Sequence, residues 1–190
     1  LVIILFTIVL RKQVRLRTYA LQRETYLNYY IADLSRKLLA DVSIDNISKV
    51  VLEYLTELTS SRHGLAGYIE RNSSEVLTPF FFERKGEIFT FKKISIRTEK
   101  INSLMFSVLA RKEVFFTNEK IDNQIWKEIP DGHIEINNFI SSPAIIGGEA
   151  VGFILLANSE KKYGNAEVNI IENFASALPY FFSELASNMK

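Results

Sequence analysis

The sequence predicts an α+β fold: a central, mainly antiparallel sheet of about six strands with helices on both sides, preceded by a long N-terminal helix. Gly147-Gly148 separates two apolar runs, Phe139–Ile146 and Ala150–Ala157. This pattern indicates a β-hairpin, because glycine adopts positive φ without steric cost. Both runs are apolar at nearly every position, which antiparallel strands show only when both faces are covered. Two amphipathic patterns, 44–59 and 165–188, predict helices that cover one face.

Length and composition suit one globular domain with an extension. The chain has 190 residues, of which 47% are hydrophobic and 24% charged, and its formal net charge is +1. The total charge gives no indication of a nucleic-acid partner. The sequence contains no cysteine, which excludes disulfides, thiolate zinc sites and thiol nucleophiles. Because the first residue is leucine, we expect the chain to be a piece of a longer protein.

Residues 1–10, LVIILFTIVL, form an apolar run that Thr7 alone interrupts. A membrane-spanning helix needs about 20 such residues, so the run is half of one. Basic residues follow at once, as they do at the cytoplasmic end of a transmembrane helix. They are Arg11, Lys12, Arg15 and Arg17. We therefore expect the end of a truncated membrane span, with the rest of the chain on the cytoplasmic side of the cell membrane. The alternative is a buried strand or helix of a soluble protein.

Residues 11–42 are predicted to form a juxtamembrane signalling helix. Its apolar positions recur at a spacing near 3.5 residues, as in a two-helix coiled coil. They are Leu16, Ala20, Leu27, Ile31, Leu34 and Leu38. This pattern favours a homodimer through the Leu16–Leu38 helix. The same stripe could instead pack on the chain's own domain, and the two arrangements need not exclude each other.

The remaining elements are expected within residues 43–190. Ser43 is the predicted N-cap of the 44–59 helix, and Asn165 that of the 165–188 helix, in which Pro179 should produce a kink or break. Three strands are expected before residue 100, and short connecting elements after it. The strands are 63–70, 76–83 and 88–97, and the connecting elements are a helix at 101–109, a strand at 114–117 and a helix at 119–129.

The residues that could carry chemistry are few. The two histidines, His63 and His133, lack the spacing of a zinc motif, and no phosphate-binding glycine loop or nucleophile elbow occurs. We therefore expect no metal site, no catalytic residues and no enzymatic activity in this chain.

The second half of the chain resembles the closing half of a GAF domain, in particular the GAF domains of membrane-bound bacterial and archaeal sensor proteins. The pattern comprises Pro130, Gly132, His133, Phe139, Pro143, Gly148, Gly152, Ala157, Asn158 and Tyr163, followed by a helix. The resemblance implies a GAF-like, PAS-related fold and a sensory input domain. In the family the last helix usually continues into a kinase, a cyclase or another output domain.

A small-molecule site is expected near the hairpin. Its candidate ligand-binding residues are His133, Tyr68, Phe82, Trp126, Phe139 and Asn158. Each has a structural alternative: the imidazole of His133 could fix its loop, Asn158 could bond its own backbone in a turn, and the aromatic rings could be core. The ligand is unknown, and no cofactor is predicted. Bilin attachment and methionine sulfoxide reduction both use cysteine, so neither is expected.

The function predicted from the sequence is signal input and relay in a membrane-anchored protein of a two-component system. A sensor histidine kinase is the expected parent protein, and a diguanylate cyclase is the alternative. The rival interpretation is a dimerisation module that binds nothing, its cavity filled by Phe80–Phe82 and Trp126. No nucleic-acid partner is expected.

Overall fold

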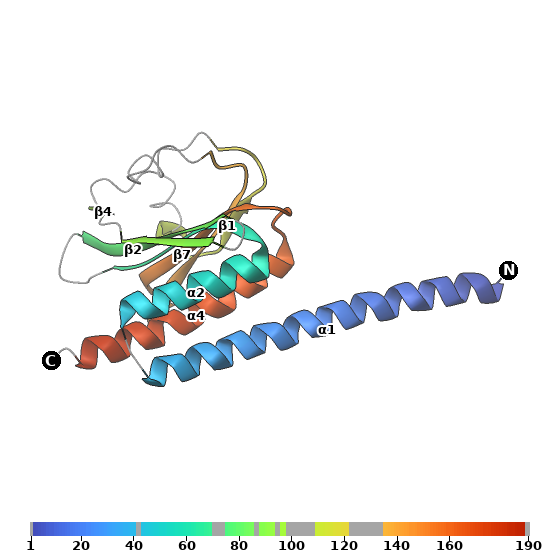
Figure 1. The fold of residues 1–190 in the computed structure, drawn as a ribbon, viewed down its shortest axis with the longest axis horizontal. Helices are drawn as coiled ribbons and strands as arrows, with labels where there is room; N and C mark the ends of the chain where they lie inside the picture. The colour runs from blue at the N-terminus through green and yellow to red at the C-terminus, as the bar shows by residue number, and fades with distance from the viewer. Residues whose placement is uncertain are drawn as a thin grey trace.

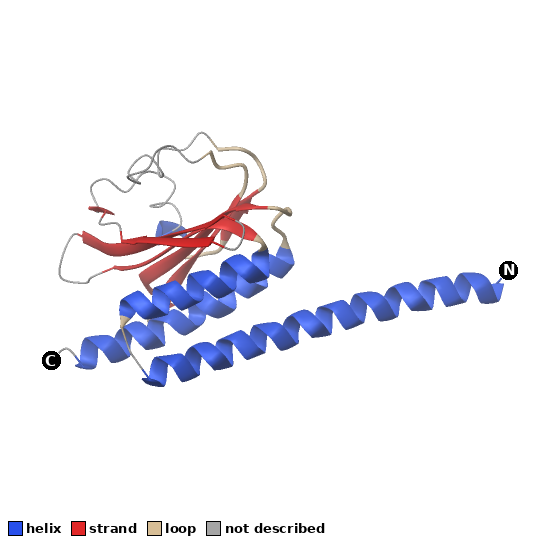
Figure 2. Ribbon diagram, viewed as in Figure 1, coloured by secondary structure: helices blue, strands red, loops and turns tan. Residues whose placement is uncertain are grey.

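A computed structural model of the chain describes residues 2–40, 43–69, 75–85, 88–93, 96–97, 109–121 and 135–188. It consists of an antiparallel sheet and a layer of long helices on one of its faces (Figures 1 and 2). The helices are α1 (Val2–Ala40), α2 (Ile44–Thr59) and α4 (Asn165–Asn188). The strands are β1 (Ser61–Ile69), β2 (Glu75–Lys85), β3 (Ile88–Lys93), β4 (Ile96–Arg97), β5 (Phe115–Thr117), β6 (Phe139–Ile146) and β7 (Glu149–Ser159). The predicted α+β class is confirmed.

The strand order is β3-β2-β1-β7-β6-β5, and β4 also pairs with β2. The predicted single strand 88–97 is wrong, because β3 pairs with one end of β2 and β4 with the other. The predicted helix 119–129 does not begin at Glu119, since Ile121 forms a β-bridge with Ile136. Its remaining residues and most of the predicted helix at 101–109 lie outside the described residues.

The central hairpin has the predicted turn. Gly147 and Gly148 have φ values of +57° and +81°, as a type I′ turn requires. The turn joins β6, with the predicted bounds, to β7, which is one residue longer at its start and two at its end. Val151 to Ala157 are all buried, so β7 is covered on both faces.

Side-chain and backbone caps set the bounds of α2. The Ser43 hydroxyl accepts a hydrogen bond from the Asn46 N–H at 3.2 Å, as predicted for an N-cap. Ser60, with φ +54°, ends the helix in the left-handed conformation.

The cap of α4 lies one residue before the predicted one. The Gly164 carbonyl accepts hydrogen bonds from the N–H groups of Glu167 and Val168, each at 3.0 Å. The Glu167 carboxylate in turn accepts the Gly164 N–H at 3.0 Å, so Gly164 and not Asn165 is the N-cap. The helix continues through Pro179 to Asn188, so the break predicted as one of two outcomes does not occur. Leu178 and Pro179 are both buried at this point.

One hydrophobic core fills the space between the helices and the sheet. The cluster contains Leu34, Ile47, Val51, Leu52, Leu55, Ala66, Phe82, Ile140, Ala144, Val151, Ile154, Leu156, Tyr163, Ile170, Ile171, Phe174, Ala175 and Leu178. Apart from Tyr163, which lies between β7 and α4, its members come from α1, α2, α4 and the four strands β1, β2, β6 and β7. The long helices and the sheet therefore share a single interior.

The helix α1 runs without interruption across the predicted boundary between residues 1–10 and 11–42. Its C-terminal part packs on the domain through fully buried Leu34 and the partly buried Leu27 and Ile31. The Tyr54 hydroxyl of α2 donates to the Asp33 carboxylate. The N-terminal half extends beyond the domain (Figure 1). Across the part of the chain that the structure describes, none of the helices combines the length and the apolar content needed to cross a membrane.

A chain of buried hydroxyl groups joins the end of α2, the start of β1 and the segment between β7 and α4. The Tyr163 hydroxyl lies 2.7 Å from Ser61 Oγ, which lies 2.6 Å from Thr59 Oγ1, and Thr59 donates to the Leu55 carbonyl at 2.6 Å. The Asn118 side chain bonds both backbone groups of Tyr163, which ties β5 to the start of α4. Burial raises the pKa of Tyr163 well above its usual range, although its hydrogen bonds act in the opposite direction.

Replacing Tyr163 tests this junction. Tyr163→Phe should lower the free energy of unfolding by about 1 kcal/mol at pH 7, the net value of one buried hydrogen bond. Above about pH 10 the unfolded chain releases the phenol proton before the folded chain does. The wild type should therefore lose stability as the pH rises from 10, and the variant should lose less. Urea unfolding at pH 7, 9, 10 and 11 measures both effects. Parallel pH profiles would contradict a buried, protonated hydroxyl.

Candidate functional site

The two faces of the sheet can be told apart at Gly64. A Cβ added there would lie 2.9 Å from Leu52 Cδ2 and 3.4 Å from Thr56 Cγ2, so this side of β1 faces α2. Side chains alternate along a strand, which places His63 and Leu65 on the opposite side. We call that side the distal face.

The distal face has an apolar floor. His63 pairs with Ala157, which pairs with Phe139, and Leu65 pairs with Leu155. Directly paired residues share a face, so these side chains lie side by side. Phe139 is fully buried, and its ring centroid lies 5.6 Å from that of Phe115 in β5. The floor is therefore a packed, mostly apolar surface spread over four strands, and it also includes the buried Ser141.

A polar cluster lies at one end of this floor. Asn158 Nδ2 donates to the Glu135 carbonyl at 2.8 Å and lies 3.1 Å from His63 Nδ1. Asn158 Oδ1 accepts the Asn137 N–H at 2.9 Å, which fixes the orientation of the amide. His63 Nδ1 is therefore an acceptor, and the proton of a neutral imidazole lies on Nε2, 3.8 Å from the Glu83 carboxylate. Histidine, amide and carboxylate groups together can recognise a polar ligand.

The structure brings together some of the predicted site residues and separates others. Phe139 lies on the distal face, and Asn158 beside it. Phe82 pairs with Gly64 and is buried in the core on the helix side, where its ring meets Phe91 edge to face at 5.0 Å. Tyr68, four residues after Gly64, alternates to the same side and is half-buried. Trp126 and His133 lie outside the described residues.

His63 and Glu83 belong to the cluster but were not predicted as site residues. The two residues lie close together because of the β1–β2 register, in which His63 pairs with Glu83, 20 positions later in the sequence. The available signal was a histidine at the start of an apolar strand. Among the residues that the structure describes, no group of three histidine or carboxylate side chains could hold a metal ion.

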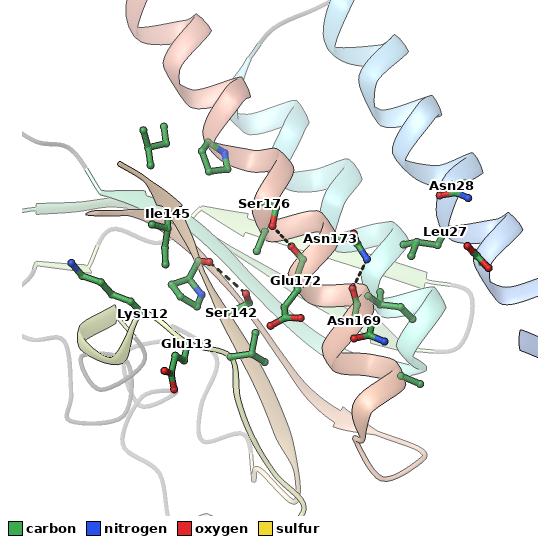
Figure 3. A pocket seen from close by; sticks show the side chains of 18 of the residues that line it. Leu27, Asn28, Lys112, Glu113, Ser142, Ile145, Asn169, Glu172, Asn173 and Ser176 are labelled. Carbon is green, nitrogen blue, oxygen red and sulfur yellow. Dashed lines mark hydrogen bonds between the residues drawn. The ribbon is translucent and has the colours of Figure 1, made fainter. Parts of the chain in front are cut away.

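An open groove of about 1480 Å³ lies on the helix side, between α1, α4 and the β6–β7 hairpin (Figure 3). Part of its polar lining is engaged with the chain's own backbone. Asn173 donates to the Asn169 carbonyl and Ser176 to the Glu172 carbonyl, each at 2.7 Å. Asn158 in the distal cluster is engaged with the chain in the same way. The distal face is preferred here because it carries the predicted residues Phe139 and Asn158, whereas the lining of the groove contains none of the predicted site residues.

A family model described as "GAF domain" matches residues 41–178. The chain belongs to the GAF domain family. The GAF domain is a regulatory and sensory domain and is not itself catalytic. It occurs in histidine kinases, chemotaxis proteins and other signalling proteins. No curated protein matches the chain.

Solved GAF domains share the fold at low sequence identity. The GAF domain of an Acinetobacter phosphoenolpyruvate-protein phosphotransferase has a TM-score of 0.67 at 11% identity, over 87% of this chain and 95% of its own. The A. aeolicus nlh2 GAF domain in an inactive state has a TM-score of 0.61 at 16% identity, over 85% and 98%. The GAF domain of a two-component sensor histidine kinase from Bacillus halodurans has a TM-score of 0.52 at 12% identity, over 79% and 100%.

The contribution of Asn158 can be separated into its backbone and side-chain parts. Asn158 has φ +57°, a conformation that glycine adopts freely and alanine does not. Asn158→Gly should lose about 1–2 kcal/mol with the side-chain hydrogen bonds, and Asn158→Ala about 1 kcal/mol more. Urea unfolding measures both losses of stability. In both variants the Asn137 amide proton should exchange with solvent faster than in the wild type, because its acceptor is removed.

The matched control is Asn173→Ala on the exposed side of α4, which should change stability by no more than about 0.5 kcal/mol. Equal stability of wild type, Asn158→Gly and Asn158→Ala would show that the amide does not hold the segment at Glu135 and Asn137.

Proposed function

We propose that the chain is the sensory input and signal-relay domain of a membrane-anchored protein on the cytoplasmic side of the cell membrane. It binds a small molecule on the distal face and passes a conformational change through a homodimer. Its parent protein is a sensor histidine kinase, with a diguanylate cyclase as the alternative. Membership of the GAF family supports the sensory role. The solved sensor histidine kinase GAF domain, with the same fold, is consistent with the first parent.

The observation that carries the proposal is the position of α1 and α4 in one layer behind the candidate site. Leu34 of α1 is buried in the same core as Ala175 and Leu178 of α4. That core also contains Leu156 of β7, whose neighbours Leu155 and Ala157 face the distal side. A shift of β7 at the site therefore reaches both long helices through direct packing.

A ligand changes this packing only if it binds one arrangement of the helices more tightly than the other. The contact between α1 and the domain is small. A second packing arrangement of α1 on the domain would therefore break few contacts. Leu34 is the one fully buried side chain of this contact among the described residues, and the open groove separates α1 from much of α4. The Tyr54–Asp33 hydrogen bond adds a directional contact at the α1–α2 interface.

Native mass spectrometry of the purified chain tests ligand binding. The wild type should carry a copurified small molecule, and His133→Ala should lose most of it, because the predicted loop contact to a polar ligand is removed. Lys161→Ala, an exposed lysine after β7, is the matched control and should keep the ligand. Bare protein in all three samples, with no thermal stabilisation by a metabolite collection, would favour the module that binds nothing.

The oligomeric state tests the relay. Leu16 lies on the predicted stripe and is exposed in the single chain, whereas Leu34 of the same stripe is buried. Leu16→Asp should shift the chain from dimer to monomer in sedimentation experiments, because it places a charge in the helix–helix seam. Tyr29→Asp, at an exposed position on another side of α1, is the matched control and should remain a dimer. A monomeric wild type would contradict the homodimer.

A further inference from the structure

The first turns of α1 present apolar side chains on every side. All the large apolar residues from Ile3 to Leu10 are exposed, with exposed fractions from 48% to 81%. Successive helical residues are rotated by about 100°, so eight consecutive positions surround the helix completely. A seam between two helices, or a helix lying flat on a bilayer, would need an apolar stripe and a polar stripe instead. The pattern requires an apolar medium around the whole helix.

A ring of basic residues follows. Arg11, Lys12, Arg15 and Arg17 are all exposed, and no acidic residue occurs before Glu24. By the same rotation, the first three lie on one side of the helix and Arg17 lies on another. They occupy a band of about 9 Å along the axis. This is similar to one lipid headgroup layer, which is about 5–8 Å thick on either side of a hydrocarbon core of about 30 Å.

We propose that residues 3–17 of α1 enter a bilayer end-on and that the basic ring binds anionic lipid headgroups. Residues 3–10 extend about 12 Å along the helix axis, and this length would lie in the hydrocarbon region. Guanidinium groups bind phosphate oxygens in pairs, and the lysine adds a point charge. This inference rests on the membrane anchoring in the proposed function and adds the lipid class and the orientation of the helix.

Vesicle sedimentation of the full chain tests the lipid class. Vesicles of phosphatidylcholine alone are compared with vesicles that also contain 30% phosphatidylglycerol. Each basic residue near an anionic surface contributes about 1 kcal/mol, or about fivefold in binding. Replacing all four ring residues by glutamine should therefore weaken binding to the anionic vesicles by about a hundredfold or more. Binding to the neutral vesicles should change little. Binding of the wild type to the anionic vesicles should also fall in 0.5 M salt.

The control variant replaces Arg62, Lys112, Lys161 and Lys162 by glutamine. These residues are exposed on the domain and carry the same total charge. The control should bind anionic vesicles as the wild type does. Equal binding of the wild type to both vesicle types would overturn anionic recognition and leave membrane anchoring intact. Absence of binding to either type would overturn both.

The orientation is tested separately. Because the chain has no cysteine, a single spin label can be placed through Ile4→Cys or Leu10→Cys. End-on insertion predicts that the label at position 4 lies deeper in the anionic bilayer than the label at position 10, by about 9 Å. Equal depths at the two positions would overturn end-on insertion in favour of a helix that lies along the surface.

Discussion

The fold depends on the burial of its three central strands on both faces. In β7 seven consecutive residues, 151–157, are buried, so neither face of the sheet centre is left to solvent. One face is covered by α2 and α4, and α1 joins them through Leu34. The opposite, distal face is buried just as fully, as Leu65 and Phe139 show. Each buried side chain of this size contributes about 1.5–3 kcal/mol to the free energy of folding. A molecule bound against the distal face would therefore contact residues on which the stability of the domain also depends.

Two hydrogen-bonded polar clusters lie at the ends of this largely apolar centre. At one end, the hydroxyl chain runs from Thr59 through Ser61 to Tyr163, and its Ser61–Tyr163 bond joins residues 102 positions apart in sequence. At the edge of the distal face, Asn158 holds the backbone at Glu135 and Asn137 and also contacts His63. Buried polar groups are costly unless they are bonded, so both clusters constrain how the strand ends meet. The distal cluster is the one that combines such constraint with groups able to recognise a ligand.

Local signals predicted a large part of the fold. The Gly147-Gly148 pair specifies its turn through φ alone, and the apolar periods and caps predicted α2, α4 and the hairpin to within a few residues. Strand register is a non-local property and was not available. Phe82 and Phe139 are both phenylalanines in apolar strands, and the sequence does not show which face of the sheet each ring occupies. Phe82 pairs with Gly64, so its ring lies on the helix side, whereas Phe139 lies on the distal face. The partnership of His63 with Glu83 was missed for the same reason.

The uninterrupted helicity of α1 has a mechanical consequence. Leu34 is docked on the domain, and Leu10 lies 24 residues earlier on the same helix, about 36 Å away along the axis. A rigid rod held near one end acts as a lever arm. A tilt of about 5° at the docked end would displace the far end by about 3 Å. The length of α1 would thus convert a small repacking beneath the sheet into a displacement several times larger at the other end of the rod.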